Sequence, residues 1–355
     1  MRRCEYLAVT AVNDPLSEPG APVLARLPYR RSLRALLPDV DTLACGLKAA
    51  LKTDGCPLTI VERQPQIYAS SYPSEIVRCR FADGSERQIL CKYATGLDHN
   101  TYGHRGGVAY EADVYRHVLE PLRTSTPRFY GSLAEVSSRG AWLLIEYIAE
   151  GVRADEAQSP PEALRRAAGW IGHFHSANEA RLFSTPLAFL HVHDGDYYRQ
   201  WARRTADFAG DWHQQLPWLA PLCSRVEMLA DAFAALPRTV IHGEFTPHNT
   251  LIRGEDVCPI DWESAAIAIG EIDLAGLTDG WPSEVVLDCE LEYQRARWPQ
   301  SASPDFKRTL DMARLYWDLL WLGHQPARPT VRPYVERTRR RFSHLHSIGR
   351  RLELI

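Results

Sequence analysis

The sequence predicts an α+β protein with two lobes, in which a small antiparallel sheet precedes a larger, mainly helical body. Residues 75–81 and 87–93 alternate apolar and polar side chains around an Ala-Asp-Gly-Ser turn, which is typical of a β-hairpin. Beyond residue 150, apolar residues recur at helical spacing in several long stretches. A chain of 355 residues is long enough to bury one large core or two modest ones.

The first part of the chain divides into an extension and a sheet-containing lobe. Residues 1–60 are expected to form an N-terminal extension, because prolines such as Pro15, Pro22, Pro28 and Pro38 interrupt them and only one helix is expected, near residues 41–52. Residues 61–147 are expected to form the small lobe. In it, the hairpin is followed by a helix over residues 107–122, whose apolar side chains fall on one face, and by a strand at residues 142–145.

Residues 148–355 are expected to form the helical lobe. Its first helix begins at Ser159, where a serine, two prolines and a glutamate form a typical helix start, and runs to about His175. Further helices are predicted over residues 196–208, 222–235, 305–322 and 333–352. The sequence contains no internal repeat and no low-complexity linker.

Composition and charge exclude several classes of protein. Hydrophobic residues make up 45% of the chain and charged residues 24%, which is ordinary for a soluble globular protein. The formal net charge of -3 provides no general attraction for nucleic acid. No apolar run approaches the roughly 18–20 residues that would cross a membrane. Eight cysteines are scattered singly, which argues against a disulfide framework or a zinc site and favours the reducing cytoplasm.

The most informative segment begins with the run Val-Ile-His-Gly-Glu-Phe-Thr-Pro-His-Asn at residues 240–249. An apolar, strand-like run leads into a turn that carries His242, Glu244 and Asn249, and a second apolar run then delivers Asp261. One acid that orients a hydroxyl, together with an amide oxygen and a second carboxylate that hold a metal, suits phosphoryl transfer from a metal-bound nucleotide. Mg²⁺ favours such hard oxygen ligands, with phosphate and water completing its shell.

These residues resemble the aminoglycoside phosphotransferase family, the small-molecule branch of the protein-kinase-like fold. The family's catalytic loop reads His-Gly-Asp, four residues, Asn, and here it reads His242-Gly243-Glu244, four residues, Asn249. The family's metal-binding Asp is matched by Asp261. Its downstream Asp-Leu-Ala, which buttresses the loop, is matched by Asp273-Leu274-Ala275. The resemblance covers about residues 65–280.

The resemblance implies a bilobal protein-kinase-like fold with a nucleotide-binding N-lobe at residues 61–147 and a C-lobe at residues 148–355 that carries the catalytic loop and the acceptor pocket. A lysine in mid-strand is costly to bury unless it is paired. The resemblance implies two partners for Lys92, namely the phosphates of the nucleotide and the carboxylate of Glu111. It assigns catalysis to Glu244, His242 and Asn249, and metal binding to Asn249 and Asp261. It assigns nucleotide binding to Lys92, Glu111, Ser70, Ser71 and backbone groups of Glu146, Tyr147 and Ile148.

Two positions depart from the family pattern. Glu244 is one methylene longer than the family's Asp, which moves its oxygens by roughly an ångström, and misplacement on that scale can cost about 10²-fold in rate. A shift of the backbone would bring the oxygens of the longer side chain back into position. Glu also has the same charge as Asp and a similar pKa. The turn expected to cover the phosphates, residues 66–74, contains no glycine. The hydroxyl and amide groups of Ser70 and Ser71 are expected to serve there.

The leading hypothesis is therefore transfer of the γ-phosphate of ATP (or GTP), with Mg²⁺, to a hydroxyl of a small molecule such as an aminoglycoside-like compound, a sugar or an amino alcohol. An alternative is a catalytically weak or inactive nucleotide-binding pseudokinase that acts as a binding module. A protein kinase fits less well, because His-Gly-Glu stands in place of His-Arg-Asp and Asp-Trp-Glu in place of Asp-Phe-Gly.

The acceptor pocket is the part that the sequence constrains least. Acidic and aromatic residues between positions 279 and 292 would suit a cationic or sugar-like alcohol, although a solvated acidic helix explains them equally well: Asp279, Trp281, Glu284, Asp288, Glu290 and Glu292. Trp317 and Trp321 share a helical face with Leu320, which favours a core stripe over a binding wall. His191 and His193 are interpreted as solvated or capping residues, and His175 as support for the catalytic loop.

Overall fold

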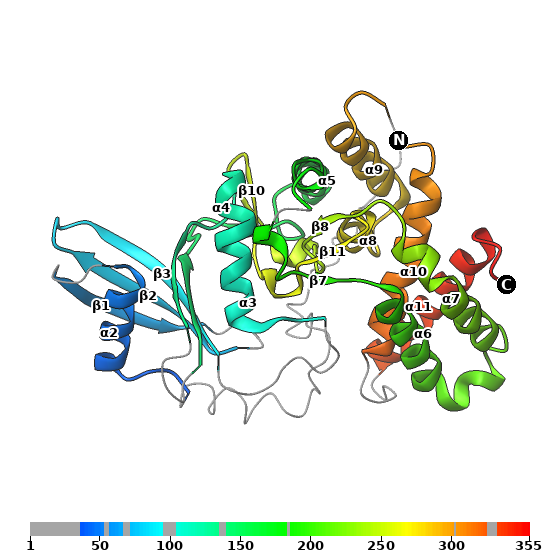
Figure 1. The fold of residues 1–355 in the computed structure, drawn as a ribbon, viewed down its shortest axis with the longest axis horizontal. Coiled ribbons are helices and arrows are strands. Elements are labelled where there is room, and N and C mark those ends of the chain that lie inside the picture. The colour runs from blue at the N-terminus through cyan, green and yellow to red at the C-terminus, as the bar shows by residue number, and fades with distance from the viewer. Residues whose placement is uncertain are drawn as a thin grey trace, which may run out of the picture.

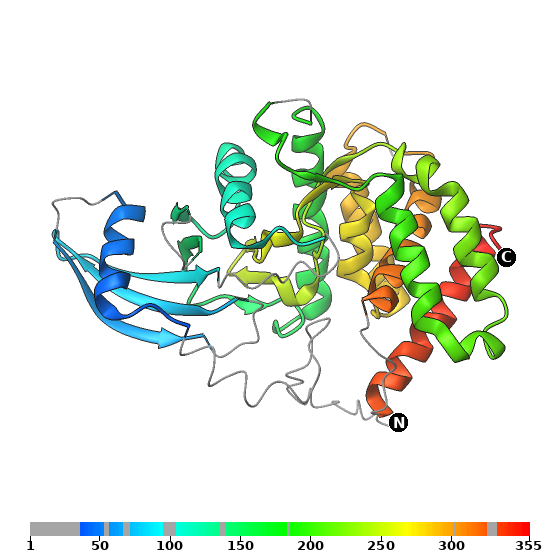
Figure 2. The ribbon, with the colours of Figure 1, turned by 60° about the horizontal axis from the view of Figure 1, so that its bottom comes forward.

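The computed structural model describes residues 36–52, 57–66, 72–94, 104–134, 140–182, 185–301, 303–324 and 332–355. They form two lobes, a small one built on a sheet and a larger one built mainly of helices (Figure 1). The view in Figure 2 shows the same division, with the strands and one helix at one end of the molecule and the helices α6, α7, α10 and α11 at the other. The α+β, bilobal arrangement predicted from the sequence is confirmed.

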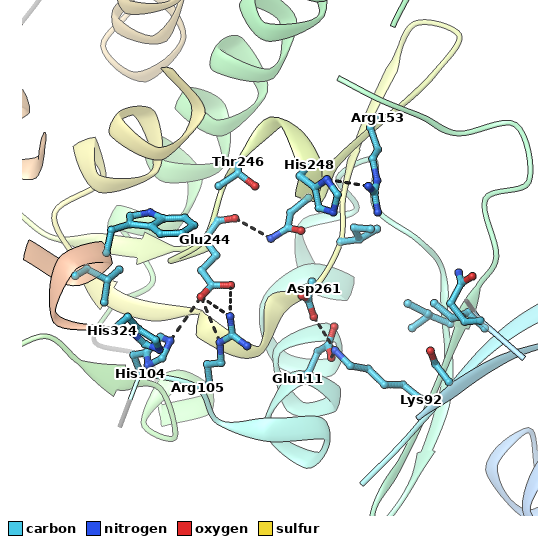
Figure 3. Close-up of a pocket in the computed structure, with 18 of the residues that line it drawn as sticks. Lys92, His104, Arg105, Glu111, Arg153, Glu244, Thr246, His248, Asp261 and His324 are labelled. Atoms are coloured by element: carbon cyan, nitrogen blue, oxygen red, sulfur yellow. Dashed lines mark hydrogen bonds and ion pairs between the residues drawn. The ribbon is translucent and has the colours of Figure 1, made fainter. Parts of the chain in front are cut away.

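The small lobe contains a five-stranded antiparallel sheet. Its strands occur in the spatial order β1-β2-β3-β5-β4 and have the bounds β1 (Leu58–Pro65), β2 (Ser74–Phe81), β3 (Glu86–Tyr93), β4 (Phe129–Leu133) and β5 (Trp142–Glu146). The predicted hairpin is β2–β3, in which Ser74 pairs with Lys92 and Arg80 pairs with Glu86. This register places Lys92 near the end of β3 that borders the other lobe (Figure 3).

The small lobe begins earlier than residue 61. The helix α2 (Val40–Ala50) packs its Leu43 and Leu47 into a core shared with Val77, Trp142 and Leu144. The proposed boundary at residue 60 falls inside β1, which pairs with β2 along its length. Sequence reasoning missed this because the alternation in β1 is broken by a register shift between residues 60 and 62. By packing, therefore, α2 and β1 belong to the small lobe.

One helical segment covers the opposite face of the sheet. It consists of α3 (Gly107–Val114), a π-helical turn (Tyr115–Leu119) and α4 (Glu120–Leu122), which together match the helix predicted over residues 107–122. Alternate residues of β5 point to opposite faces, so Leu143 and Ile145 pack in the core that includes α3 while their neighbours pack on α2. This packing places Glu111 of α3 over the end of the sheet beside the cleft (Figure 3).

Within its described residues, the large lobe is built mostly of seven longer helices. Five of them correspond to predicted stretches, namely α5 (Pro160–Glu179), α6 (Gly195–Ala209), α7 (Leu219–Ala234), α10 (Phe306–Gly323) and α11 (Arg332–Arg351). The other two are α8 (Glu271–Thr278) and α9 (Ser283–Arg297). Buried leucines, tryptophans and tyrosines from these helices form one core that continues to α3.

Short strands in the large lobe hold the loops that matter for function. One small sheet has the order β10-β9-β6, with β6 (Val152–Arg153), β9 (Thr250–Arg253) and β10 (Asp256–Pro259). The other has the order β7-β11-β8, with β7 (His191–Val192), β8 (Thr239–Ile241) and β11 (Ala266–Ala268). The loop at residues 242–249 therefore joins β8 to β9, and the loop at residues 260–265 joins β10 to β11. Because β9 and β10 pair, the two loops are brought side by side.

No helix among the described residues combines the length and the apolar character needed to cross a membrane. Cys79, Cys91 and Cys258 are free thiols and are buried, an environment in which cysteine behaves as a small hydrophobic residue.

The packing of α2 on β5 predicts the effect of one substitution. A Cβ atom added at Gly46 would lie 2.2 Å from the Trp142 ring, so Gly46→Ala forces α2 away from the sheet. We expect the free energy of unfolding to fall by about 1–3 kcal/mol, although alanine is the better helix former by about 1 kcal/mol. Denaturant unfolding measures this, with Lys48→Ala on the exposed face of α2 as the control. An unchanged or raised stability of Gly46→Ala would contradict this packing.

Candidate active site

The loop at residues 242–249 is anchored by a buried carboxylate, that of Asp273. Asp273, on α8, accepts hydrogen bonds from the backbone N–H groups of His242 (2.7 Å) and Gly243 (2.9 Å). Its Oδ2 also lies 3.0 Å from Nε2 of the buried His175. Gly243 has a φ of +86°, and a Cβ there would lie 2.1 Å from the Ser264 carbonyl oxygen, so glycine is required. The supporting positions predicted for Asp273 and His175 agree with these contacts.

His242 connects this loop to the one that carries Asp261. It is fully buried, its Nε2 lies 2.9 Å from the Ile260 carbonyl oxygen, and its Nδ1 is 3.3 Å from the Glu244 backbone N–H. The tautomer that satisfies both contacts carries its proton on Nε2, so that Nδ1 accepts. His242 does not line the cavity described next. The geometry thus makes it a positioning residue of the loop, although it was included above among the residues assigned to catalysis.

A cavity between the two lobes brings together side chains that are far apart in the sequence (Figure 3). It is lined by Gln66, Ser74, Leu90, Lys92, His104, Arg105, Glu111, Ile145, Arg153, Glu244, Thr246, His248, Asn249, Ile260, Asp261, Trp317, Leu320, Trp321 and His324. Five of the predicted site residues are among them: Lys92, Glu111, Glu244, Asn249 and Asp261.

Lys92 forms ion pairs with carboxylates of both lobes. Its Nζ lies 2.7 Å from Glu111 Oε2 in the small lobe and 2.6 Å from Asp261 Oδ1 in the large lobe. Glu111 Oε1 accepts from the Trp262 backbone N–H at 3.1 Å. Burial would lower the pKa of Lys92, but the carboxylates of Asp261 and Glu111 raise it well above its usual range. Lys92 therefore remains a cation at the floor of the cavity.

Asn249 and Asp261 present oxygen atoms suited to a hard metal ion. The Asn249 side-chain N–H donates to the Glu244 carbonyl oxygen at 3.1 Å, which leaves its amide oxygen available. Asp261 has a left-handed backbone (φ 67°, ψ 62°), a strained conformation for a residue other than glycine and one that often marks functional sites. Burial would raise the pKa of Asp261, but Lys92 lowers it, so the carboxylate is ionised. One amide oxygen and one carboxylate fit Mg²⁺, which binds few protein ligands and several phosphate or water oxygens.

Arg105 holds the carboxylate of Glu244. Its Nη2 lies 2.9 Å from Oε1 and 3.1 Å from Oε2 of Glu244, and its Nη1 lies 3.2 Å from Oε1 of the buried Glu263. His104 Nε2 is 3.6 Å from Glu244 Oε1 (Figure 3). Burial would raise the pKa of Glu244, but Arg105 and His104 lower it well below its usual range. Glu244 is therefore ionised and fixed in orientation.

Sequence reasoning missed His104 and Arg105. They occur within the run Gly-His-Arg-Gly-Gly at residues 103–107, directly before α3. Two basic residues among glycines, ahead of the helix that carries Glu111, were the available signal. The contact itself could not be inferred, because Arg105 and Glu244 are 139 positions apart.

Some hydrogen-bonding groups of the connector between the lobes, residues 146–148, are already paired within the protein. The backbone N–H groups of Glu146 and Tyr147 donate to the carbonyl oxygens of Arg128 (2.8 Å) and Gln88 (3.3 Å). The Glu146 carboxylate accepts from Arg253. For the Ile148 N–H, no protein acceptor lies within the described part of the chain. Of the three predicted connector residues, Ile148 thus has the amide best suited to a nucleotide base.

Ser70 and Ser71 lie outside the described residues. Gln66 and Ser74, which precede and follow them in the sequence, line the cavity.

The expectation of an acidic acceptor pocket is wrong for the described residues. None of the six residues between positions 279 and 292 lines the cavity. Asp279 pairs with Arg341, Glu290 with Arg314 and Glu292 with Arg165, all at 3.1 Å or less. The core stripe predicted for Trp317, Leu320 and Trp321 is confirmed, because Trp317 and Leu320 are buried in the core and Trp321 packs against it. All three side chains also line the cavity.

No metal site is formed by clustered side chains elsewhere in the described chain. Groups of three or more His, Cys, Asp or Glu residues placed to hold an ion do not occur among the described residues. His193 is buried and stacks on Tyr197 with ring centroids 3.8 Å apart, and burial lowers its pKa to about 3. The interpretation of His193 as solvated or capping is wrong, because His193 is packed in the interior and the residue that caps α6 is Asp194.

Comparison with known proteins identifies the family. A sequence model of the phosphotransferase enzyme family (APH) matches residues 99–308, more than half of the chain. The chain belongs to this family. No curated protein sequence matches it. Membership supports a small-molecule phosphotransferase in general terms, and the resemblance to aminoglycoside phosphotransferases drawn from the sequence is confirmed.

Solved structures share the fold of this phosphotransferase. The amicoumacin kinase hAmiN, in complex with AMP-PNP, Ca²⁺ and Ami, is 13% identical with a TM-score of 0.61, and the alignment covers 89% of this chain and 96% of that one. A choline/ethanolamine kinase family protein from Mesorhizobium loti is 17% identical with a TM-score of 0.51, covering 88% and 96%. The gentamicin complex of APH(2")-IIa is 13% identical with a TM-score of 0.54, covering 88% and 96%. These likenesses confirm the protein-kinase-like fold.

The Asp273 anchor generates a test of loop support. In Asp273→Asn the amide offers one acceptor oxygen where the carboxylate offers two, so one of the two loop N–H groups is left without an acceptor. We expect the free energy of unfolding to fall by roughly 1–3 kcal/mol. Denaturant unfolding measures this, with Asp288→Asn on the exposed face of α9 as the matched control. Equal stabilities of the two variants would show that Asp273 does not anchor the loop.

Proposed function

We propose that this protein is an ATP-dependent phosphotransferase that moves the γ-phosphate to a hydroxyl group of a small molecule. The observation that carries the proposal is the convergence of Lys92, Asp261, Asn249 and Glu244 on one cavity between the lobes. A cation for phosphate, two oxygen ligands for a metal and an ionised acid for a hydroxyl are the parts that phosphoryl transfer requires.

The small-lobe side of the cavity suits the nucleotide. Leu90, Ile145 and Ile260 provide apolar surfaces for a flat base, and the Ile148 N–H lies on the connector that follows Ile145. Lys92 would bind phosphate oxygens, with Glu111 keeping it in place. Asn249 and Asp261 would hold Mg²⁺, which when bound neutralises charge on the phosphate oxygens. ATP and GTP share the triphosphate that these groups recognise.

Glu244 would orient the acceptor hydroxyl. Because its pKa is lowered, it acts mainly as a hydrogen-bond acceptor that aims the hydroxyl, which suits a reaction dominated by positioning. A glutamate side chain has one more rotatable bond than an aspartate, and Arg105 removes that freedom by contacting both carboxylate oxygens. This contact offers a physical reason why the longer acid can serve at this position.

The alternative is a catalytically weak or inactive nucleotide-binding pseudokinase that acts as a binding module. It would bind ATP at the same cavity and leave it unconsumed. The geometry favours the enzyme, because the charged groups required for transfer are all present and ionised.

Nucleotide binding predicts a ligand-dependent rise in stability. With ATP and Mg²⁺ at about one hundred times the dissociation constant, the wild type should be stabilised by about 2.7 kcal/mol, seen as a raised melting temperature. Asp261→Asn should lose most of that rise, because it removes a metal ligand and a partner of Lys92. Asp256→Asn, an exposed substitution in the neighbouring hairpin, is the control and should keep it. An equal shift in Asp261→Asn would contradict the assignment of the site.

The lowered pKa of Glu244 predicts a specific pH dependence. In the wild type the carboxylate stays ionised well below its ordinary pKa of about 4.3, so kcat should show no acidic limb from Glu244 above that value. In Arg105→Gln the main remaining influence is burial, which raises the pKa. An acidic limb should then enter the kcat profile at higher pH than in the wild type. Profiles with the same acidic limb would show that Arg105 does not set the ionisation of Glu244.

A further inference from the structure

One face of α10 forms the wall of the cavity next to Glu244. Trp317, Leu320, Trp321 and His324 occur at positions i, i+3, i+4 and i+7, so all four project from the same side of the helix. All four line the cavity, and Trp317 and Leu320 are buried. The wall therefore offers two indole rings, one aliphatic side chain and one imidazole to the molecule whose hydroxyl Glu244 would orient.

The imidazole of this wall, His324, and the neighbouring imidazole of His104 carry no charge at neutral pH. The rings of His104 and His324 meet edge to face with centroids 4.3 Å apart, and Trp201 stacks on His324 at 5.2 Å. Burial lowers the pKa of His104, and it lowers the pKa of His324 to about 3. His104 Nδ1 is buried and has no hydrogen-bond partner among the described residues, so it is an acceptor suited to a ligand O–H or N–H group.

The acids nearest to the wall are already neutralised. Arg341 lies over the Trp321 ring at 4.7 Å and donates to Asp318 (2.8 Å) and Asp279 (2.5 Å). Asp279 also accepts from the Trp317 indole N–H at 3.3 Å. The guanidinium thus occupies one face of Trp321 and uses both carboxylates. A second cation on that ring would be repelled instead of gaining a cation–π contact.

Glu244, the acid at the floor of this half of the cavity, is paired as well. Arg105 pairs with Glu244 at 2.9 Å and with Glu263 at 3.2 Å. Among the described residues, every carboxylate near the acceptor half of the cavity is therefore already paired with a cation. An ammonium group placed there would find no carboxylate free to pair with it. Transfer of an ammonium ion from water into such a site is unfavourable, whereas an uncharged ring meets surfaces that match it.

Resting on the proposed function, we infer that the acceptor is an uncharged alcohol with a flat or ring-shaped apolar body, and not a polycationic aminoglycoside or a cationic amino alcohol. Its ring would lie against Trp317 and Trp321, with its hydroxyl directed at Glu244. In the transfer, the hydroxyl oxygen bonds to the γ-phosphorus as the bond from that phosphorus to the ADP oxygen breaks. The hydroxyl proton leaves by way of Glu244 to water.

A matched set of acceptors tests this inference. Phenylpropanol and phenylalaninol share a ring and a primary alcohol, and only the second carries an ammonium group; gentamicin adds a polycation. Initial rates of ADP formation with each compound give kcat/KM. We expect phenylpropanol to be preferred over phenylalaninol by about tenfold or more, which corresponds to about 1.4 kcal/mol. Equal values, or a preference for either amine, would overturn the inference.

A binding measurement decides the matter where turnover is too slow to rank the compounds. Ring stacking on the wall should quench indole fluorescence saturably, with tighter binding of phenylpropanol than of phenylalaninol. The quench should weaken in Trp321→Phe and persist in Trp298→Phe, whose side chain does not line the cavity. No saturable quench by either compound, or tighter binding of the amine, would overturn the inference.

A charge introduced into the wall should weaken or remove the preference for phenylpropanol. His324→Glu places a carboxylate where the neutral imidazole stands, and it should move the selectivity towards phenylalaninol by about tenfold, whereas the uncharged His324→Gln should keep the preference for phenylpropanol. Unchanged selectivity in both variants would count against this wall as the acceptor site. The proposed function fails separately, if ATP with Mg²⁺ does not stabilise the wild type.

Discussion

The site depends on one ion pair that crosses the cleft. Lys92 comes from the sheet of the small lobe, and its Nζ lies within 2.7 Å of Glu111 in the same lobe and of Asp261 in the other. Charges buried in this way are costly unless each has its partner, so the pairing sets how closely the two lobes approach. The spacing of the lobes in turn determines how the other parts of the cavity, from the apolar surfaces near the connector to the α10 wall, face one another.

The glutamate in the catalytic loop is the point at which this chain departs from its family's pattern. In the structure this glutamate is held by Arg105, whose guanidinium contacts both of its carboxylate oxygens and also reaches Glu263. A longer and more flexible acid is thus restrained by a rigid, fork-shaped partner, which is the kind of recognition that arginine provides and lysine does not. The same contact neutralises the acid and so shapes the class of acceptor that the cavity suits.

The sequence predicted what depends on local pattern and missed what depends on distant contacts. The β2–β3 hairpin, the helix from residue 107 and the loop with His242, Glu244 and Asn249 could be predicted because spacing alone defines them. The small lobe's true start could not, since β1 is irregular and α2 is fixed by packing on Trp142. The roles of Arg105 and the α10 wall could not be predicted for the same reason. The role of Arg105 depends on Glu244, more than a hundred positions away, and the role of the wall depends on which face of α10 borders the cavity.

The most direct test of the central claim is whether bound ATP is consumed through Glu244. ADP formation would be followed for the wild type and Glu244→Gln with phenylpropanol present, alongside the rise in melting temperature that ATP and Mg²⁺ cause. We expect a similar rise in both proteins and a rate that falls by roughly 10²-fold or more in the variant. A wild type that binds ATP without consuming it, or a variant that consumes it as fast as the wild type, would show that Glu244 does not serve phosphoryl transfer.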